Sequence, residues 1–209
     1  MKLTANKSFR VVEYLLEHPE TSQLELSKRT EVAIGHVNKI INYLYDLNIV
    51  SKRPRGCVLR DPVRLLEKIS FERPLKWLEA TTLRLPTTSI EETEAVINET
   101  CHRNKVDYAL TSFSGLRRYY EYHISYPQIH AYASDPELER RMERGEGAIP
   151  VTLLNPDRPE ILANSREIDG LRACGRIQIV VDLFSSGYGR DAAVKFLEVI
   201  QNGAEENTR

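Results

Sequence analysis

The sequence predicts an α+β protein, with a small N-terminal domain and a larger mixed α/β domain after it. Two observations predict this class. Three stretches with helical periodicity precede two short strand-like stretches in residues 1–60, and strand-like and helix-like stretches alternate from about residue 78. Of the 209 residues, 41% are hydrophobic and 28% charged, as in ordinary globular proteins. We divide the chain into residues 1–60, a connecting helix at 61–77, a domain at 78–202 and a polar tail at 203–209.

The first two helices are predicted from apolar spacing and capping. Residues 7–17 carry apolar side chains at helical intervals, and His-Pro ends this stretch. The second helix begins after Ser22, because Glu25 follows it by three residues, as in a capping box. We expect Leu24 and Leu26 to point inward.

The third helix and a hairpin complete the N-terminal domain. The helix has one apolar stripe, formed by Ile34, Val37, Ile41 and Leu44 and widened by Ile40 and Leu47. The stretch "SKRPRGCVLR" follows and predicts two short strands around an Arg-Pro-Arg-Gly turn, with Val50 and Val58 in the core. Three helices followed by a hairpin is the order of a winged helix-turn-helix.

The face opposite the apolar stripe is made of small and hydrogen-bonding residues rather than Glu/Lys pairs. Such a face suits the second helix of a helix-turn-helix, which approaches base edges in the major groove. Asn can pair with adenine and Lys with guanine, and Gly35 allows close approach. The candidate base-reading residues are His36, Asn38, Lys39, Asn42 and Tyr43.

Basic residues surround this helix and predict contacts with phosphates. Lys52, Arg53 and Arg55 lie at the hairpin tip, and Arg29 and Thr30 lie between the second and third helices. Residues 1–60 contain ten Lys/Arg and six Asp/Glu, a net charge of +4, although the whole chain has −1. A basic end on an acidic body indicates a polyanionic partner for that end. The alternative is a protein-binding module whose basic hairpin is a solvated edge.

In the C-terminal region, predicted strands alternate with predicted helices. We expect strands at "LEATTLRLP", "VDYALTS", "QIHAYAS" and "AIPVTLLNP", and extended chain from "PEILANS" onward. We expect helices at "SIEETEAVINETCHRNK", "SGLRRYYEYH", "PELERRMERG" and near the end, while "GRIQIVVDLF" fits either a strand or a short helix. Trp77, the single tryptophan, is expected to pack at the junction between the domains. The stretch "RRYYEYHISY" fits a stacking surface for nucleic acid or ligand. It fits equally a core and dimer contact.

Two resemblances bear on function. The segment "SQLELSKRTEVAIGHVNKIINYLYDLNIV" resembles the winged helix-turn-helix of prokaryotic transcriptional regulators. The segments "DYALTSFSGLRRYYEYHISYPQIHAYAS", "VTLLNP" and "VVDLFSSGYGRDAAVKFLEVI" resemble the AbiEi-type antitoxin family, over roughly residues 8–60 and 105–200. The second resemblance implies a transcriptional repressor or autoregulator, sometimes paired with a nucleotidyltransferase toxin. Its alternative is an antitoxin that neutralises its partner by direct contact.

The C-terminal region is also distantly similar to a nucleotidyltransferase domain, but it lacks the catalytic groups. Such enzymes need a Gly-Ser loop for phosphate and paired carboxylates for two metal ions. Here "TSFSGL" stands at the loop position, and the next strand carries His130, Tyr132 and Ser134 where an Asp-x-Asp pair would lie. Asp182 remains as a lone carboxylate. We therefore expect no catalytic residues, and an enzyme acting on nucleotides is the third alternative.

Other sites and compartments are constrained by what the sequence lacks. No Gly-x-Ser-x-Gly motif surrounds Ser112 and Ser114, so we expect them to cap the helix near Gly115. Three separate cysteines form neither a disulfide framework nor a metal site, and we expect no metal or cofactor. No apolar run reaches the length of a membrane span, so we expect a cytoplasmic protein. The partner expected from the third helix and the basic hairpin is double-stranded DNA. A toxin protein or a small effector is a further candidate partner, and a two-fold operator would require a homodimer.

Overall fold

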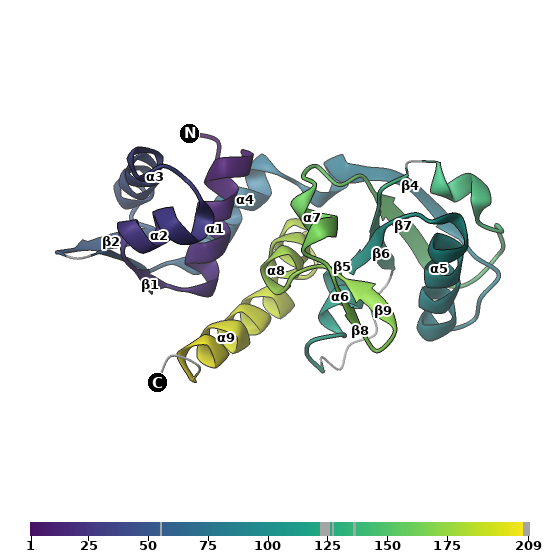
Figure 1. Cartoon of the computed structure of the whole chain (residues 1–209). Coiled ribbons are helices and arrows are strands. Elements are labelled where there is room, and N and C mark those ends of the chain that lie inside the picture. Colours follow the sequence, from purple (N-terminus) through teal and green to yellow (C-terminus); the bar gives the residue numbers. More distant parts are fainter. Residues whose placement is uncertain (55, 122–125, 127, 136, 207–209) are drawn as a thin grey trace.

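The computed structural model of the chain describes residues 1–54, 56–121, 126, 128–135 and 137–206, with side chains to residue 203. It confirms the α+β class. A unit of helices and a three-stranded sheet is followed by a six-stranded mixed sheet with helices around it (Figure 1). The N-terminal elements are α1 (Asn6–Glu17), β1 (Glu20–Thr21), α2 (Gln23–Thr30), α3 (Ile34–Asp46), β2 (Val50–Arg53) and β3 (Gly56–Leu59).

The N-terminal unit packs three amphipathic helices around one apolar core. Their inward side chains are fully buried, for example Val12 of α1, Leu26 of α2 and Ile41 of α3. Ser22 caps α2 by accepting a hydrogen bond from the backbone N–H of Glu25 at 3.0 Å, as the capping box predicts. The strands lie in the order β1-β3-β2, all antiparallel, so the hairpin gains a third strand from the α1–α2 connection.

Gly56 is required by this third strand rather than by the turn. A Cβ atom at Gly56 would clash with the backbone carbonyl of Thr21, which belongs to β1. Val50 and Val58 are buried in the core, as predicted. The hairpin is therefore fixed to the helices at its base, and its tip projects from the unit (Figure 1).

Two apolar side chains that we predicted to be buried are exposed. Leu24 is 55% exposed, because it lies two residues, or about 200° of helical rotation, from the buried Leu26. Ile34 is 51% exposed. It is the first residue of α3 and lies at the edge of a buried stripe that is centred on Val37 and Ile40.

The connection between the two units consists of α4 (Pro62–Glu72) and a 3₁₀ turn, η1 (Leu75–Leu78). The prediction that Trp77 packs at the junction is wrong, because its side chain is 73% exposed. Arg73 and Leu75, which are 4% and 2% exposed, occupy the junction instead. Phe71, at the end of α4, is 82% exposed.

The C-terminal unit is built on a mixed sheet with the strand order β4-β7-β6-β5-β9-β8. β6 and β7 are parallel, as are β5 and β9, while the other neighbours are antiparallel. The strands are β4 (Glu79–Arg84), β5 (Tyr108–Thr111), β6 (Ile129–Ala133), β7 (Pro150–Leu154), β8 (Arg166–Ile168) and β9 (Leu171–Ala173). The helices are α5 (Ile90–Asn104), α6 (Ser112–Leu116), η2 (Leu138–Arg141), α7 (Glu160–Ala163), α8 (Arg176–Ser185) and α9 (Arg190–Glu206).

Several predicted elements differ from the observed ones. Among the described residues of "SGLRRYYEYH" the helix ends at Leu116, and the described residues of "PELERRMERG" contain only the short η2; residues 122, 123 and 136 of these stretches lie outside the described part. The stretch that begins at "PEILANS" contains a short helix, α7, before β8 and β9. The ambiguous "GRIQIVVDLF" is the helix α8, and the tail predicted at 203–209 begins inside α9.

The two units pack against each other through helices from opposite ends of the chain. The guanidinium of Arg176 in α8 pairs with Glu17 of α1 at 2.6 Å, and Gln201 of α9 donates a hydrogen bond to the carbonyl of Leu16 at 2.7 Å. Figure 1 shows α7 and α8 between α1 and the sheet, while α9 extends below α1. No helix in the described part of the chain is both long and apolar enough to cross a bilayer.

Candidate nucleic-acid interface

The exposed side of α3 is polar and carries no like-charged cluster. Asn38 and Lys39 are exposed and Asn42 is half-buried, on the side of the helix away from the core. Gly35 is exposed, and a Cβ atom there would meet nothing within 4 Å. Tyr45, 46% exposed, continues this side toward the C-terminal end of the helix. We call these five residues the α3 face.

Two predicted base-reading residues lie outside the α3 face, which corrects that part of the prediction. The Nε2 atom of His36 is 3.2 Å from the hydroxyl of Ser8 in α1, and the ring of Tyr43 packs against the core. The two residues are seven apart, so they lie on the same flank of the helix. That flank faces the rest of the N-terminal unit. Sequence reasoning missed Tyr45, although its spacing of seven from Asn38 and three from Asn42 was a usable signal.

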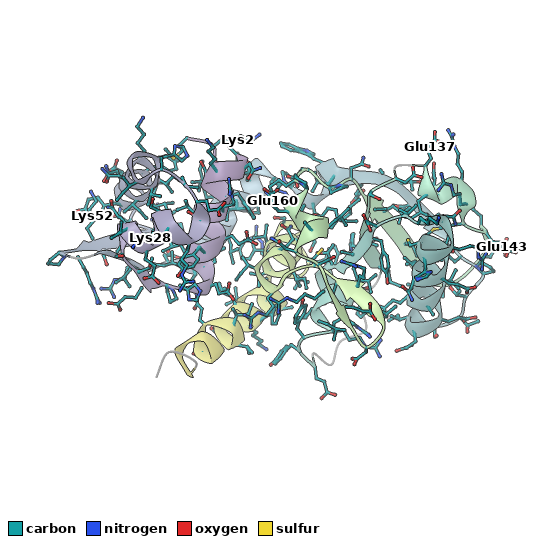
Figure 2. The ribbon with its side chains drawn as sticks, viewed as in Figure 1. Lys2, Lys28, Lys52, Glu137, Glu143 and Glu160 are labelled. Carbon is teal, nitrogen blue, oxygen red and sulfur yellow. The ribbon has the colours of Figure 1, made fainter. Side chains whose placement is uncertain are left out.

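The hairpin brings a basic side chain to the α3 face. Lys52 of β2 places its Nζ atom 4.4 Å from the centre of the Tyr45 ring, a cation–π contact that joins the hairpin to α3. Arg53 pairs with Glu20 of β1, and both side chains are largely exposed. Arg55 lies outside the described residues. In Figure 2, Lys52 and Lys28 lie at one end of the molecule, while Glu137 and Glu143 lie at the opposite end.

The two phosphate candidates at the end of α2 differ in accessibility. Arg29 is exposed beside the start of the α2–α3 turn. Thr30 is 5% exposed, and its hydroxyl donates a hydrogen bond to the carbonyl of Leu26 at 2.5 Å. The hydroxyl of Thr30 is therefore committed inside its own helix, and we remove Thr30 from the predicted phosphate-contacting side chains.

The lone carboxylate of the C-terminal unit is the centre of a buried polar network. Asp182 is fully buried in α8 and pairs with Arg73 at 2.8 Å. Its oxygens also accept hydrogen bonds from Thr111 at 2.6 Å, Gln178 at 2.8 Å and Tyr132 at 3.1 Å. Three of these four hydrogen bonds go to Oδ1 and the one from Thr111 goes to Oδ2, and the positive charge of Arg73 balances that of the carboxylate. Asp182 therefore links Arg73, at the end of α4, to the strands β5 and β6 of the sheet.

Ser112 and His130 lie beside this network without forming a usable pair of catalytic groups. Ser112 starts α6 in a left-handed conformation (φ 54°) and is fully buried, and its hydroxyl has no partner among the described residues. Ser112 and Ser114 both lie inside α6, and the N-cap is Thr111, so the predicted capping role is wrong. Burial lowers the pKa of His130 to about 4. A buried, neutral imidazole and a buried hydroxyl offer no access to a substrate.

The described residues include no group of three or more His, Cys, Asp or Glu side chains arranged to hold a metal ion. No family model, no curated protein and no solved structure matches this chain.

Proposed function

We propose that this protein is a sequence-specific DNA-binding transcriptional regulator. One observation carries the proposal: the α3 face combines the exposed Asn38 and Lys39 with the half-buried Asn42 on one side of the helix, beside a hairpin that carries Lys52. Amides can bond adenine in a bidentate manner, and a lysine can donate to the O6 and N7 atoms of guanine. Opposite this face the helix is apolar and buried, so its orientation is fixed.

In this proposal the N-terminal unit is a winged helix-turn-helix and α3 is the recognition helix. The α3 face reads base edges in the major groove, while Arg29, Lys52 and Arg53 contact phosphates. The net charge of +4 in residues 1–60 supports this division. Tyr45 joins the set of candidate contacts, and His36 and Tyr43 support the helix from behind.

We place the protein, as part of the same proposal, beside the AbiEi-type antitoxins that its C-terminal segments resemble. The expected activity is repression or autoregulation in the cytoplasm of a prokaryotic cell. Catalysis is not part of the proposal, because Asp182 is neutralised by Arg73 inside the buried network.

Fluorescence anisotropy with the protein's own promoter DNA and a scrambled duplex, across a salt series, tests the proposal. We expect tight promoter binding, weaker scrambled binding and a steep salt dependence. Lys39→Ala should reduce the preference for the promoter. Arg53→Ala should weaken both duplexes about equally and reduce the salt slope by about one unit. Equal, weak binding of both duplexes by the unmodified chain would refute sequence-specific recognition.

A second candidate function, binding of a protein toxin, is favoured by a different observation. Phe71 and Trp77 are 82% and 73% exposed on either side of the junction, and large aromatic side chains are enriched in protein interfaces. Because Trp77 is the single tryptophan, its fluorescence would report a partner directly. Co-purification of a stoichiometric toxin, with a blue shift of Trp77 and no DNA binding, would favour this function over the first.

A further inference from the structure

A cleft of about 520 Å³ lies where the N-terminal unit meets the C-terminal unit. One wall is formed by α1 and the last residues of α2, and the other by α7, the start of β8 and the start of α8. In Figure 2, Glu160 of α7 lies in this central region, between the N-terminal helices and the sheet. The volume falls within the range of about 300–1,000 Å³ that is usual for small-molecule sites.

The N-terminus of α8 opens into this cleft without a side-chain cap. Gly175 is the N-cap residue, the first turn has no acidic side chain, and Gly175 and Ile177 line the cleft. The first N–H groups of a helix have no acceptor within the helix, and the helix dipole favours an anion there. This end of α8 therefore offers donors to a negatively charged group.

A buried arginine beside the same helix end has an unused donor. Arg158 is 6% exposed, its guanidinium stacks 3.6 Å from the centre of the Phe9 ring, and its Nη2 donates to Gln178 at 2.8 Å. Its Nη1 lies 3.9 Å from a carboxylate oxygen of Asp157 but has no hydrogen-bond acceptor among the described residues. Arg158 lines a small inner chamber of about 20 Å³, which shares Glu160 and Gly175 with the cleft.

Glu160, which lines both the inner chamber and the cleft, carries an unused acceptor. The Oε2 atom of Glu160 is buried and has no donor among the described residues. Glu13 of α1 lines the same chamber, and burial raises its pKa although Arg158 opposes that effect. An inorganic anion would satisfy Arg158 and the end of α8 but would be repelled by Glu160 and Glu13. A guest with both charges would satisfy donor and acceptor together.

We propose that this cleft binds a small zwitterion that carries a carboxylate and an ammonium group, of which a free α-amino acid is the simplest example. The carboxylate contacts Arg158 and the N-terminus of α8, and the ammonium contacts Glu160. The side chain of the guest extends into the wider part of the cleft.

The cleft also has a consequence for regulation, which rests on the proposed DNA-binding function. Arg29 and Glu31, at the end of α2, line the cleft, and Arg29 is a candidate phosphate contact. A guest held at the start of α8, opposite the α1 wall of the cleft, therefore acts beside the DNA-contacting surface. If it changes the affinity for DNA, DNA must change the affinity for the guest by the same factor.

Thermal unfolding and isothermal titration calorimetry of the full chain with each common amino acid test the site. Inorganic phosphate and ammonium chloride are the single-charge controls. We expect at least one amino acid to raise the melting temperature and bind, and the two salts to have no such effect at equal concentration. Arg158→Met should weaken that binding about tenfold or more, because a charge-assisted hydrogen bond is lost.

Gly175→Asp keeps the test informative if Arg158→Met does not fold. The φ and ψ angles of Gly175 suit an N-cap, and a Cβ there meets only the Asn164 carbonyl at 3.9 Å. The new carboxylate should cap α8, stabilise the fold and exclude the guest, whereas Gly175→Ala should bind as the unmodified chain does. Stabilisation by phosphate alone, by no amino acid, or equally in Gly175→Asp would overturn the site.

The anisotropy experiment, repeated with saturating amino acid, separates the two proposals. Amino-acid binding without any DNA binding would refute the proposed function and leave the site intact. DNA binding without amino-acid binding would refute the site alone. Binding of both without mutual influence would overturn the regulatory part.

Discussion

Replacing Gly35 with alanine should make the protein more stable and its DNA complex weaker. Gly35 is the second residue of α3, its φ is not positive, and an added Cβ meets nothing within 4 Å. Alanine at a compatible site stabilises a protein by about 0.4–1 kcal/mol, mainly by restricting the unfolded chain. We expect about 0.5 kcal/mol, because Gly35 lies near a helix end. In the complex, the new methyl group would enter a close-packed contact, where such overpacking costs about 1–3 kcal/mol.

Two measurements on the same sample check this prediction. Urea unfolding should show a higher midpoint with an unchanged slope, and anisotropy should show about tenfold weaker promoter binding. Gly203→Ala is the matched control, because Gly203 lies in α9 and an added Cβ there also meets nothing within 4 Å. It should leave DNA affinity unchanged. If Gly35→Ala binds promoter as tightly as the unmodified chain, α3 does not approach the bases and the interface is elsewhere.

Three further predictions concern charge. Glu20→Gln should break the ion pair with Arg53 and leave the guanidinium available to phosphates. Because exposed ion pairs are worth about 0.2–1 kcal/mol, binding to any duplex should become about threefold tighter. Weaker binding, measured by anisotropy, would contradict this prediction. His130, with its pKa lowered to about 4 from 6.5 by burial, binds its proton more readily in the unfolded chain. The free energy of unfolding, measured with urea, should therefore be unaffected by His130 above pH 6.5 and should fall by about 3 kcal/mol as the pH falls toward 4. His130→Gln should remove that pH dependence. Arg73→Met should cost about 3–5 kcal/mol by leaving the Asp182 carboxylate buried and unpaired. Adding Asp182→Asn should recover most of that loss, and no recovery would show that Arg73 acts through packing alone.

The elements that could be predicted from the sequence are helices whose signals, apolar spacing on one side or a capping motif, lie within a few neighbouring residues. The helices α1 and α3 show apolar residues at helical spacing, and α2 shows a capping box. The helix α8 was ambiguous because eight of its ten residues are buried, so it lacks a polar side from which to read a period. The strand order was beyond prediction, since the pairing of β5 with β9 joins residues far apart in the chain.

The candidate site was predicted only in part, because a local pattern identifies the residues on the solvent side of a helix but not those at the edge of its buried stripe. Asn38 and Lys39 are exposed as a helical wheel indicates, whereas His36 and Tyr43 lie on a flank whose burial depends on α1 and the core. Polar residues at the edge of an apolar stripe can face solvent or a neighbouring helix, and only the tertiary packing decides between them. The Lys52–Tyr45 contact likewise required the position of the hairpin relative to α3.

The junction between the two units combines a strong contact with a weak one, and this asymmetry determines how one unit can influence the other. Arg73 is almost fully buried and bonds both Asp157 and Asp182, so the α4 side resists opening. On the cleft side, the Arg176–Glu17 pair is 45% and 30% exposed, and such a pair contributes little in water. A change in the angle between the units therefore costs least at the cleft. A molecule or partner that binds across the cleft acts on the softer contact, and because α1 packs directly against α3, a shift there reaches the α3 face without passing through the rigid core of the sheet.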